Sequence, residues 1–176
     1  LADWLAGHSH SLSEARAAFL GSAAGFCVFT YLFGISDRHN DNIMLHPGGK
    51  LHHVDFGHWM GNRKHFLGFN RERGPFVFNN QMVEILGGRN AHSFREFEAL
   101  CTKIYLTLAP NTLPLFFHLL SMMQNAGLPE LRSPADLMFL KQTFLTPQDM
   151  PSLIDSAIRT RSRQLDDVVH LVVHSM

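Results

Sequence analysis

The segment that decides the fold is residues 37–57, which read DRHNDNIMLHPGGKLHHVDFG. Its two short apolar runs, 43–45 and 51–54, flank the turn-forming sequence HPGGK. Apolar runs separated by proline and glycine are typical of a β-hairpin. The two ends of a hairpin lie side by side, so Asn42 and Asp55, which bracket the strands, are predicted to be neighbours although thirteen positions separate them.

The sequence outside this hairpin predicts mainly α-helix. Ser11 with Glu14 forms a capping box that opens a helix over residues 11–33. A polar, glycine- and arginine-rich segment, 57–75, is expected to be a long loop. Further helix starts are expected at Ser93 with Glu96, at Ser133-Pro134 with Asp136 and at Thr146-Pro147 with Asp149, together with an apolar helix over 113–123 and an amphipathic helix over 165–173. We therefore predict one α+β domain, predominantly α, that covers residues 1–176.

The composition limits the classes of partner and compartment. The 176 residues, 45% of them hydrophobic, suffice for one core. Fifteen basic side chains balance fifteen acidic ones, which argues against nucleic acid as a partner. Cys27 and Cys101 are far apart, and the twelve histidines accompany no CxxC or HExxH pattern, so we expect neither a disulfide framework nor a zinc site. The longest apolar run, 26–35, is about half of the ~20 residues of a membrane span, which predicts a cytoplasmic protein that is at most peripherally attached to membranes.

The oxygen-bearing side chains at the ends of the hairpin suit a divalent cation. An amide oxygen from Asn42 and a carboxylate from Asp55 are the ligands that Mg²⁺ prefers, and Mg²⁺ keeps water and phosphate oxygens in its other positions. Just upstream, residues 37–39 supply a carboxylate and an imidazole. Together these groups can align and deprotonate a hydroxyl nucleophile while the metal neutralises a transferring phosphoryl group.

Several stretches of the chain resemble kinase motifs. Residues 55–57, Asp-Phe-Gly, match the motif of protein kinases, and residues 37–39, Asp-Arg-His, invert their His-Arg-Asp. The sequence GISDRHNDNIM at 34–44 resembles the catalytic loop of phosphoinositide 3-kinases, and HVDFGH at 53–58 resembles the start of their activation loop. The sequence GNRKHFLGFNRERGPF at 61–76 resembles the class I activation loop, and the resemblance covers essentially the whole chain.

The resemblance implies the C-terminal lobe of a protein-kinase-like fold with one small catalytic hairpin. It implies a catalytic loop over residues 34–42 and an activation loop over residues 53–79. Two positions depart from the family pattern. Ser36 stands where the family usually has glycine, and Gly74 stands where a branched apolar residue usually precedes the proline.

The same resemblance implies a role for each residue of the two loops. The implied catalytic residues are Asp37, Arg38 and His39. The implied cofactor-binding residues are Asn42, Asp55, Phe56 and Gly57, of which Asn42 and Asp55 bind the Mg²⁺ that accompanies ATP. Either Asp37 or His39 removes the proton from the inositol 3-hydroxyl. We favour His39 as the base, because an imidazole accepts a proton near neutral pH, and Asp37 as the residue that orients it.

The activation loop carries a cluster of positive charge. Between residues 63 and 73 the chain has one acidic side chain, Glu72, and four basic ones, which are Arg63, Lys64, Arg71 and Arg73. Such a cluster suits a headgroup that carries phosphates. We therefore expect a phosphatidylinositol lipid phosphorylated at the 4 or the 4 and 5 positions as substrate, with Arg63 and Lys64 on the headgroup and the two later arginines bracing the loop.

The chain lacks the sequence signs of an ATP-binding lobe. It contains no glycine-rich phosphate loop, no strand lysine and no adenine hinge. We therefore expect the N-terminal lobe to be absent from this chain, and the chain alone to be inactive. A regulatory subunit or a small GTPase would bind through domains outside it. The alternatives are a phosphatidylinositol 4-kinase, a serine/threonine protein kinase of the same superfamily, and a non-catalytic pseudokinase scaffold.

Overall fold

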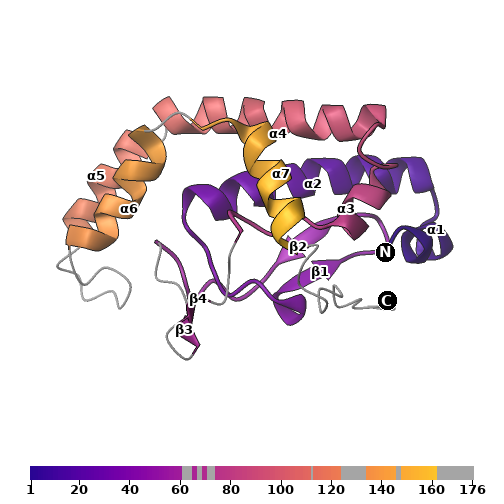
Figure 1. Cartoon of the computed structure of the whole chain (residues 1–176), viewed down its shortest axis with the longest axis horizontal. Helices are drawn as coiled ribbons and strands as arrows, with labels where there is room; N and C mark the ends of the chain where they lie inside the picture. Colours follow the sequence, from indigo (N-terminus) through magenta and orange to yellow (C-terminus); the bar gives the residue numbers. More distant parts are fainter. Residues whose placement is uncertain are drawn as a thin grey trace.

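The structure is a computed structural model that describes residues 1–60, 65–66, 69–70, 74–111, 113–123, 134–145 and 148–161. Its helices are α1 (Ala2–His8), α2 (Leu12–Leu32), α3 (Asn80–Ile85), α4 (His92–Asn111), α5 (Leu113–Met123), α6 (Pro134–Leu145) and α7 (Met150–Arg161), with a short 3₁₀ turn at Asn40–Asn42. Its strands are β1 (Ile43–Leu45), β2 (Leu51–His53), β3 (His65–Phe66) and β4 (Phe69–Asn70). Figure 1 shows a mainly helical molecule with the β1–β2 hairpin beside α2, which confirms the predicted fold class.

Helix α2 is the central element of the described core. Ser11 caps it as predicted, because its hydroxyl accepts a hydrogen bond from the Glu14 N–H at 3.4 Å. By length and composition α2 resembles a membrane span, yet it packs against α4 and β2 inside the molecule. Of the core side chains, Phe19, Phe78 and Phe97 are fully buried. Burial of one such phenyl ring stabilises the fold by about 2–3 kcal/mol.

The two cysteines belong to this core and form no disulfide. Cys27 in α2 and Cys101 in α4 are both free and buried. Burial raises the pKa of the Cys101 thiol to about 12, and burial raises the pKa of Cys27 as well. The expectation that the chain has no disulfide framework therefore agrees with the described residues.

The β1–β2 hairpin forms where the sequence predicted it and is attached to α2. Ile43 pairs with His53, and Leu45 pairs with Leu51. At the turn, Gly49 has φ +84°, and a Cβ built there would lie 1.8 Å from the Ala15 carbonyl oxygen, so only glycine fits against α2. The Leu51 N–H donates to the Ser22 hydroxyl of α2 at 2.9 Å. These contacts fix the hairpin, and with it both of its ends, relative to the core.

Helices α5 and α6 lie side by side at one end of the molecule and form a second, smaller cluster (Figure 1). The buried members of this cluster are Met60, Leu120 and Leu137. Rings packed around them are Phe33, Trp59, Phe116, Phe117 and Phe139. Among the described residues, α5 and α6 contribute no side chain to the main core. They join the rest of the molecule through this cluster, through the contact of α5 with α4 and through the contact of α6 with α2.

Several local expectations need correction. Helices α1 and α3 were not predicted, and Asn79 caps α3 by accepting from the Met82 N–H at 3.0 Å. Ser93 does not cap α4, because its hydroxyl donates to the Leu86 carbonyl and the helix begins one residue earlier. The Asp149 carboxylate caps α7 by accepting from the Ser152 N–H at 3.2 Å. The expected loop over 57–75 contains the antiparallel pair β3–β4, and the expected helix over 165–173 lies outside the described residues.

A buried histidine marks the inner face of the hairpin. The His53 side chain is 7% exposed, and its ring stacks on Phe26 with centroids 4.6 Å apart. Neither ring nitrogen has a hydrogen-bond partner among the described atoms. Burial first, and the charge of Arg38 second, lower the pKa of His53 from 6.5 to about 3. The ring is therefore neutral in the folded chain.

This depressed pKa predicts a loss of stability in acid. Between pH 6.5 and about 3 the unfolded chain binds a proton at His53 that the folded chain does not, so the free energy of unfolding falls by about 1.4 kcal/mol per pH unit as pH decreases. A His53→Phe variant keeps the stacked ring and removes the titration. Urea unfolding without divalent cations at about pH 7.5 and about pH 5 should show a loss roughly 2 kcal/mol smaller in the variant than in the parent chain.

The matched control is His52→Phe, because His52 lies on the exposed face of the same strand. It should leave the pH dependence of stability unchanged. Equal acid sensitivity in the His53→Phe variant and the parent chain would contradict the assignment of the effect to His53.

Candidate functional site

Backbone strain is concentrated at the ends of the hairpin. Among the described residues, the non-glycine residues with positive φ are Asp37 at 61°, Asp55 at 56° and Met60 at 59°. The left-handed conformation costs a non-glycine residue about 1–2 kcal/mol. Such conformations persist only where the surrounding structure fixes them, and they are concentrated at functional sites. The strain therefore points to the loops on either side of the hairpin as the site.

Two segments, 33–42 and 54–60, run alongside each other across this site. The Val54 N–H donates to the Asn42 carbonyl at 3.0 Å next to the hairpin. Farther along, the Ser36 N–H donates to the His58 carbonyl at 2.8 Å. The Met60 N–H donates to the Phe33 carbonyl at 2.7 Å. The predicted proximity of the segments that carry Asn42 and Asp55 is thus confirmed.

Arg38 fastens the two segments together from inside. Its side chain is 4% exposed. Nε donates to the Ser36 carbonyl at 3.1 Å, Nη1 donates to the Val54 carbonyl at 2.7 Å, and Nη2 donates to the Asp55 carbonyl. The guanidinium carbon also lies 5.4 Å from the centre of the Phe56 ring. The structure therefore places Arg38 where it holds other residues in position.

The side chain of Asn42 orients His39. Its Nδ2 lies 2.8 Å from the Asp37 carbonyl, which only accepts, so this atom is the amide nitrogen. The same nitrogen lies 3.1 Å from His39 Nε2, which must therefore accept. In the neutral imidazole the proton is then on Nδ1, which lies 3.6 Å from an Asp41 carboxylate oxygen. The Asn42 amide oxygen remains available to a further ligand.

Asp37 and His39 lie close enough to act together. An Asp37 carboxylate oxygen is 3.9 Å from His39 Nε2. The Asp37 side chain is buried, whereas the His39 side chain is 35% exposed. The imidazole is therefore the more accessible of the two groups, with a carboxylate near each ring nitrogen to orient it.

Asp55 and Asn42 fit the donor set of a magnesium site. The exposed Asp55 carboxylate accepts from the Gly57 N–H at 3.2 Å through Oδ1, which leaves Oδ2 for another ligand. Mg²⁺ takes one or two protein oxygens and completes its shell with water and phosphate, and this pair supplies such oxygens. Among the described residues no group of three or more His, Cys, Asp or Glu side chains is placed to bind a metal.

An apolar cavity of about 350 Å³ adjoins the site. Phe56 lines one side of it, with its ring edge-on to Phe29 at a centroid distance of 6.1 Å. The other lining residues are Phe33, Ile35, Trp59 and Phe116. The sequence identified Phe56 from its motif but not its neighbours, because apolar and aromatic residues outside a motif are indistinguishable from core residues in the sequence.

The predicted headgroup-binding residues belong to the part of the chain that the structure does not describe. Arg63, Lys64, Arg71 and Arg73 lie outside the described residues. The structure does bring together the other predicted groups, because the hairpin, the Arg38 contacts and the Asn42 amide connect residues 37–42 to residues 54–57. Sequence reasoning missed Met60, because no short motif marks an apolar residue that anchors a loop.

Comparison with known proteins gives one consistent result. A family model for "Phosphatidylinositol 3- and 4-kinase" matches residues 1–133. Phosphatidylinositol 3-kinase 1 of Dictyostelium discoideum is 40% identical over 185 aligned residues, which cover 99% of this chain and 12% of that protein. Phosphatidylinositol 3-kinase C2 domain-containing subunit gamma of Rattus norvegicus is 39% identical over 166 residues, which cover 92% of this chain and 11% of that protein.

A third relative, phosphatidylinositol 4-phosphate 3-kinase C2 domain-containing subunit beta of Homo sapiens, is 38% identical over 183 residues, which cover 97% of this chain and 11% of that protein. The chain thus spans about a tenth of the length of these curated relatives. The family model covers most of the chain. The matched range, residues 1–133, includes the hairpin and both of its flanking loops. The chain therefore belongs to the phosphatidylinositol 3- and 4-kinase family.

Proposed function

We propose that this chain is the C-terminal catalytic lobe of a phosphoinositide 3-kinase. The whole enzyme transfers the γ-phosphoryl group of ATP to the inositol 3-hydroxyl of a phosphatidylinositol lipid. The observation that carries the proposal is the hairpin, which joins the loop of Asp37, His39 and Asn42 to the Asp-Phe-Gly segment. The names of the relatives, which are phosphatidylinositol 3-kinases, support the choice of the 3-hydroxyl.

In the proposed mechanism, each loop residue acts on one reacting group. The Asn42 amide oxygen and the Asp55 carboxylate would hold the Mg²⁺ of MgATP, and the ion would supply positive charge to neutralise the transferring phosphoryl group. The Gly57 N–H keeps the Asp55 carboxylate oriented. Phe56 and Gly57, the other two residues of the motif, would contribute to nucleotide binding.

His39 is the proposed proton acceptor. The 3-hydroxyl takes the place of the Asn42 amide at Nε2 and gives its proton to that nitrogen as its oxygen attacks the γ-phosphorus. The bond between the γ-phosphorus and the β–γ bridging oxygen breaks, and ADP leaves. The Asp37 carboxylate, 3.9 Å from Nε2, then stabilises the positive imidazolium. This assignment rests on the greater exposure of the His39 side chain. The alternative is that the Asp37 carboxylate is the base.

The remaining parts of the enzyme belong to the proposal as well. An ATP-binding lobe outside this chain supplies the adenine and phosphate contacts, so the chain alone is inactive. The enzyme acts at the cytoplasmic surface of a membrane, and a regulatory subunit or a small GTPase binds through other domains. The short span of the chain relative to its relatives supports this division.

The first test identifies the product of the full-length protein that carries this chain. Phosphatidylinositol and its 4-phosphate and 4,5-bisphosphate forms are offered in vesicles with MgATP, and the positions of the product phosphates are determined. A 3-phosphorylated lipid is expected. A 4-phosphorylated product identifies a phosphatidylinositol 4-kinase, phosphopeptide formation identifies a protein kinase, and no transfer to any acceptor identifies a scaffold, so each of these results overturns the proposal.

Asp55 provides a direct test of the metal site. Replacing Asp55 by Asn in the full-length protein removes the carboxylate charge and should lower kcat by about 1000-fold or more without unfolding the protein. Turnover and thermal melting are measured together. Asp3→Asn, the same chemical change at an exposed position of α1, should leave both unchanged. Normal turnover in the Asp55→Asn protein would remove the metal assignment.

The basic activation loop should select the headgroup. If Arg63 and Lys64 meet headgroup phosphates, replacing both by Ala should lower kcat/KM by about 10- to 100-fold for phosphorylated lipids and much less for unphosphorylated phosphatidylinositol. The human relative named as a phosphatidylinositol 4-phosphate 3-kinase supports a phosphorylated substrate. Replacing Arg71 and Arg73 by Ala should lower activity on all three lipids equally. An equal loss on all lipids from the Arg63 and Lys64 pair would refute the headgroup role.

A further inference from the structure

Met60 is an apolar residue in an unusual backbone conformation. Its φ is 59°, and its side chain is 2% exposed. Unlike Asn or Asp, methionine has no short polar side chain to stabilise a left-handed backbone locally. The surrounding structure must therefore hold this conformation. In the sequence, Met60 follows Asp55 by five positions and precedes Arg63 by three.

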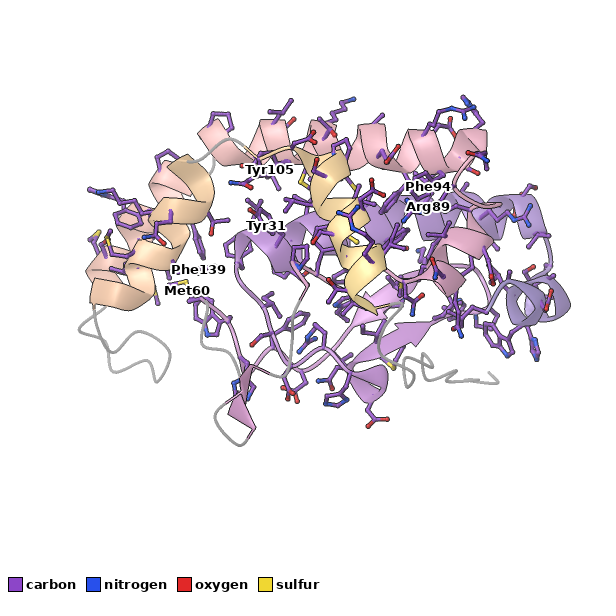
Figure 2. All side chains as sticks on the ribbon, in the orientation of Figure 1. Tyr31, Met60, Arg89, Phe94, Tyr105 and Phe139 are labelled. Carbon is purple, nitrogen blue, oxygen red and sulfur yellow. The ribbon has the colours of Figure 1, made fainter. Side chains whose placement is uncertain are left out.

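Two contacts hold Met60 in place. Its N–H donates to the Phe33 carbonyl at 2.7 Å, at the last residue before the catalytic loop. Its side chain is buried with Leu120 of α5 and Leu137 of α6. Figure 2 shows Met60 beside Phe139 of α6, which packs on the same cluster.

Phe33, the residue just before the catalytic loop, contacts α5. The Phe33 ring lies edge-on to Phe116 of α5 with centroids 4.9 Å apart. Phe33 also packs against the main core, so it belongs to both clusters. The α5–α6 pair thus packs against the site at two residues. Phe33 lies just before the catalytic loop, and Met60 lies after the Asp-Phe-Gly segment.

We propose that Met60 and the α5–α6 pair form a positioning element for the lipid substrate. By burying Met60, the two helices fix the residue from which the chain continues into the basic sequence at 63–73, and they tie that residue to Phe33 before the catalytic loop. Met60 touches no reacting atom and acts through the loop. The proposal rests on the lipid kinase function, and it makes α5 and α6 determinants of headgroup binding although they carry none of the motif residues.

The kinetic test uses the full-length protein with a Met60→Ala substitution. Loss of the buried side chain should raise the KM for the phosphorylated lipid by about tenfold, because a small displacement of positioning residues has large effects on rate and binding. The KM for ATP should stay within about twofold, since the Asp55 side of the site keeps its own contacts. Met60→Leu should restore the lipid KM, and Leu137→Ala on α6 should reproduce the effect of Met60→Ala.

The matched control is Met82→Ala. Met82 is a fully buried methionine of α3 in the main core. This variant should lose as much thermal stability as Met60→Ala and keep the wild-type lipid KM. A rise in lipid KM with Met82→Ala, or an unchanged lipid KM with Met60→Ala and Leu137→Ala, would overturn the proposal.

Hydrogen exchange separates this inference from the proposed function. The Ser36 N–H, which donates to His58, should exchange about tenfold faster in Met60→Ala and Leu137→Ala than in the wild type or Met82→Ala. This readout needs no activity. Faster exchange in a protein that makes no 3-phosphorylated lipid would refute the lipid kinase function and keep the structural coupling, whereas unchanged exchange would refute the coupling itself.

Discussion

The buried guanidinium of Arg38 joins the two loops of the site, and the geometry of the other residues depends on it. It donates to the carbonyl of Ser36 in its own loop and to those of Val54 and Asp55 in the other. Burying a charge is unfavourable unless hydrogen bonds compensate it, and here several backbone carbonyls do so. The planar guanidinium of arginine has donors in several directions, so it binds several carbonyls at once better than the single ammonium of a lysine does.

The strained conformations of the site follow from this arrangement. Asp37 and Asp55 both adopt left-handed backbone angles, one on each side of the hairpin. The Asn42 amide holds the Asp37 carbonyl, and the Arg38 guanidinium holds the Asp55 carbonyl. Each strained residue is thus fixed by a side chain of the loop at 34–42, so the unfavourable backbone angles are maintained by contacts within the site.

The site lies where two hydrophobic clusters meet. The main core fixes the hairpin to α2 through the close approach of Gly49 to Ala15 and the hydrogen bond between Leu51 and Ser22. The smaller cluster fixes Met60 to α5 and α6. Phe33, at the end of α2, belongs to both clusters. A displacement of either cluster therefore acts on the loops that carry Asp37 and Asp55.

The sequence by itself determined the hairpin, the capped start of α2 and the nearness of Asn42 to Asp55, because these depend on turn residues, capping and periodicity over short distances. It did not indicate α1 and α3, which have seven and six residues and are too short to show a helical period. Only the tertiary structure decided that Arg38 donates to carbonyls of the segment 54–60 and that Met60 packs against Leu120 and Leu137. Such contacts join residues far apart in the chain, and the folding of the backbone, rather than any local pattern, brings them together.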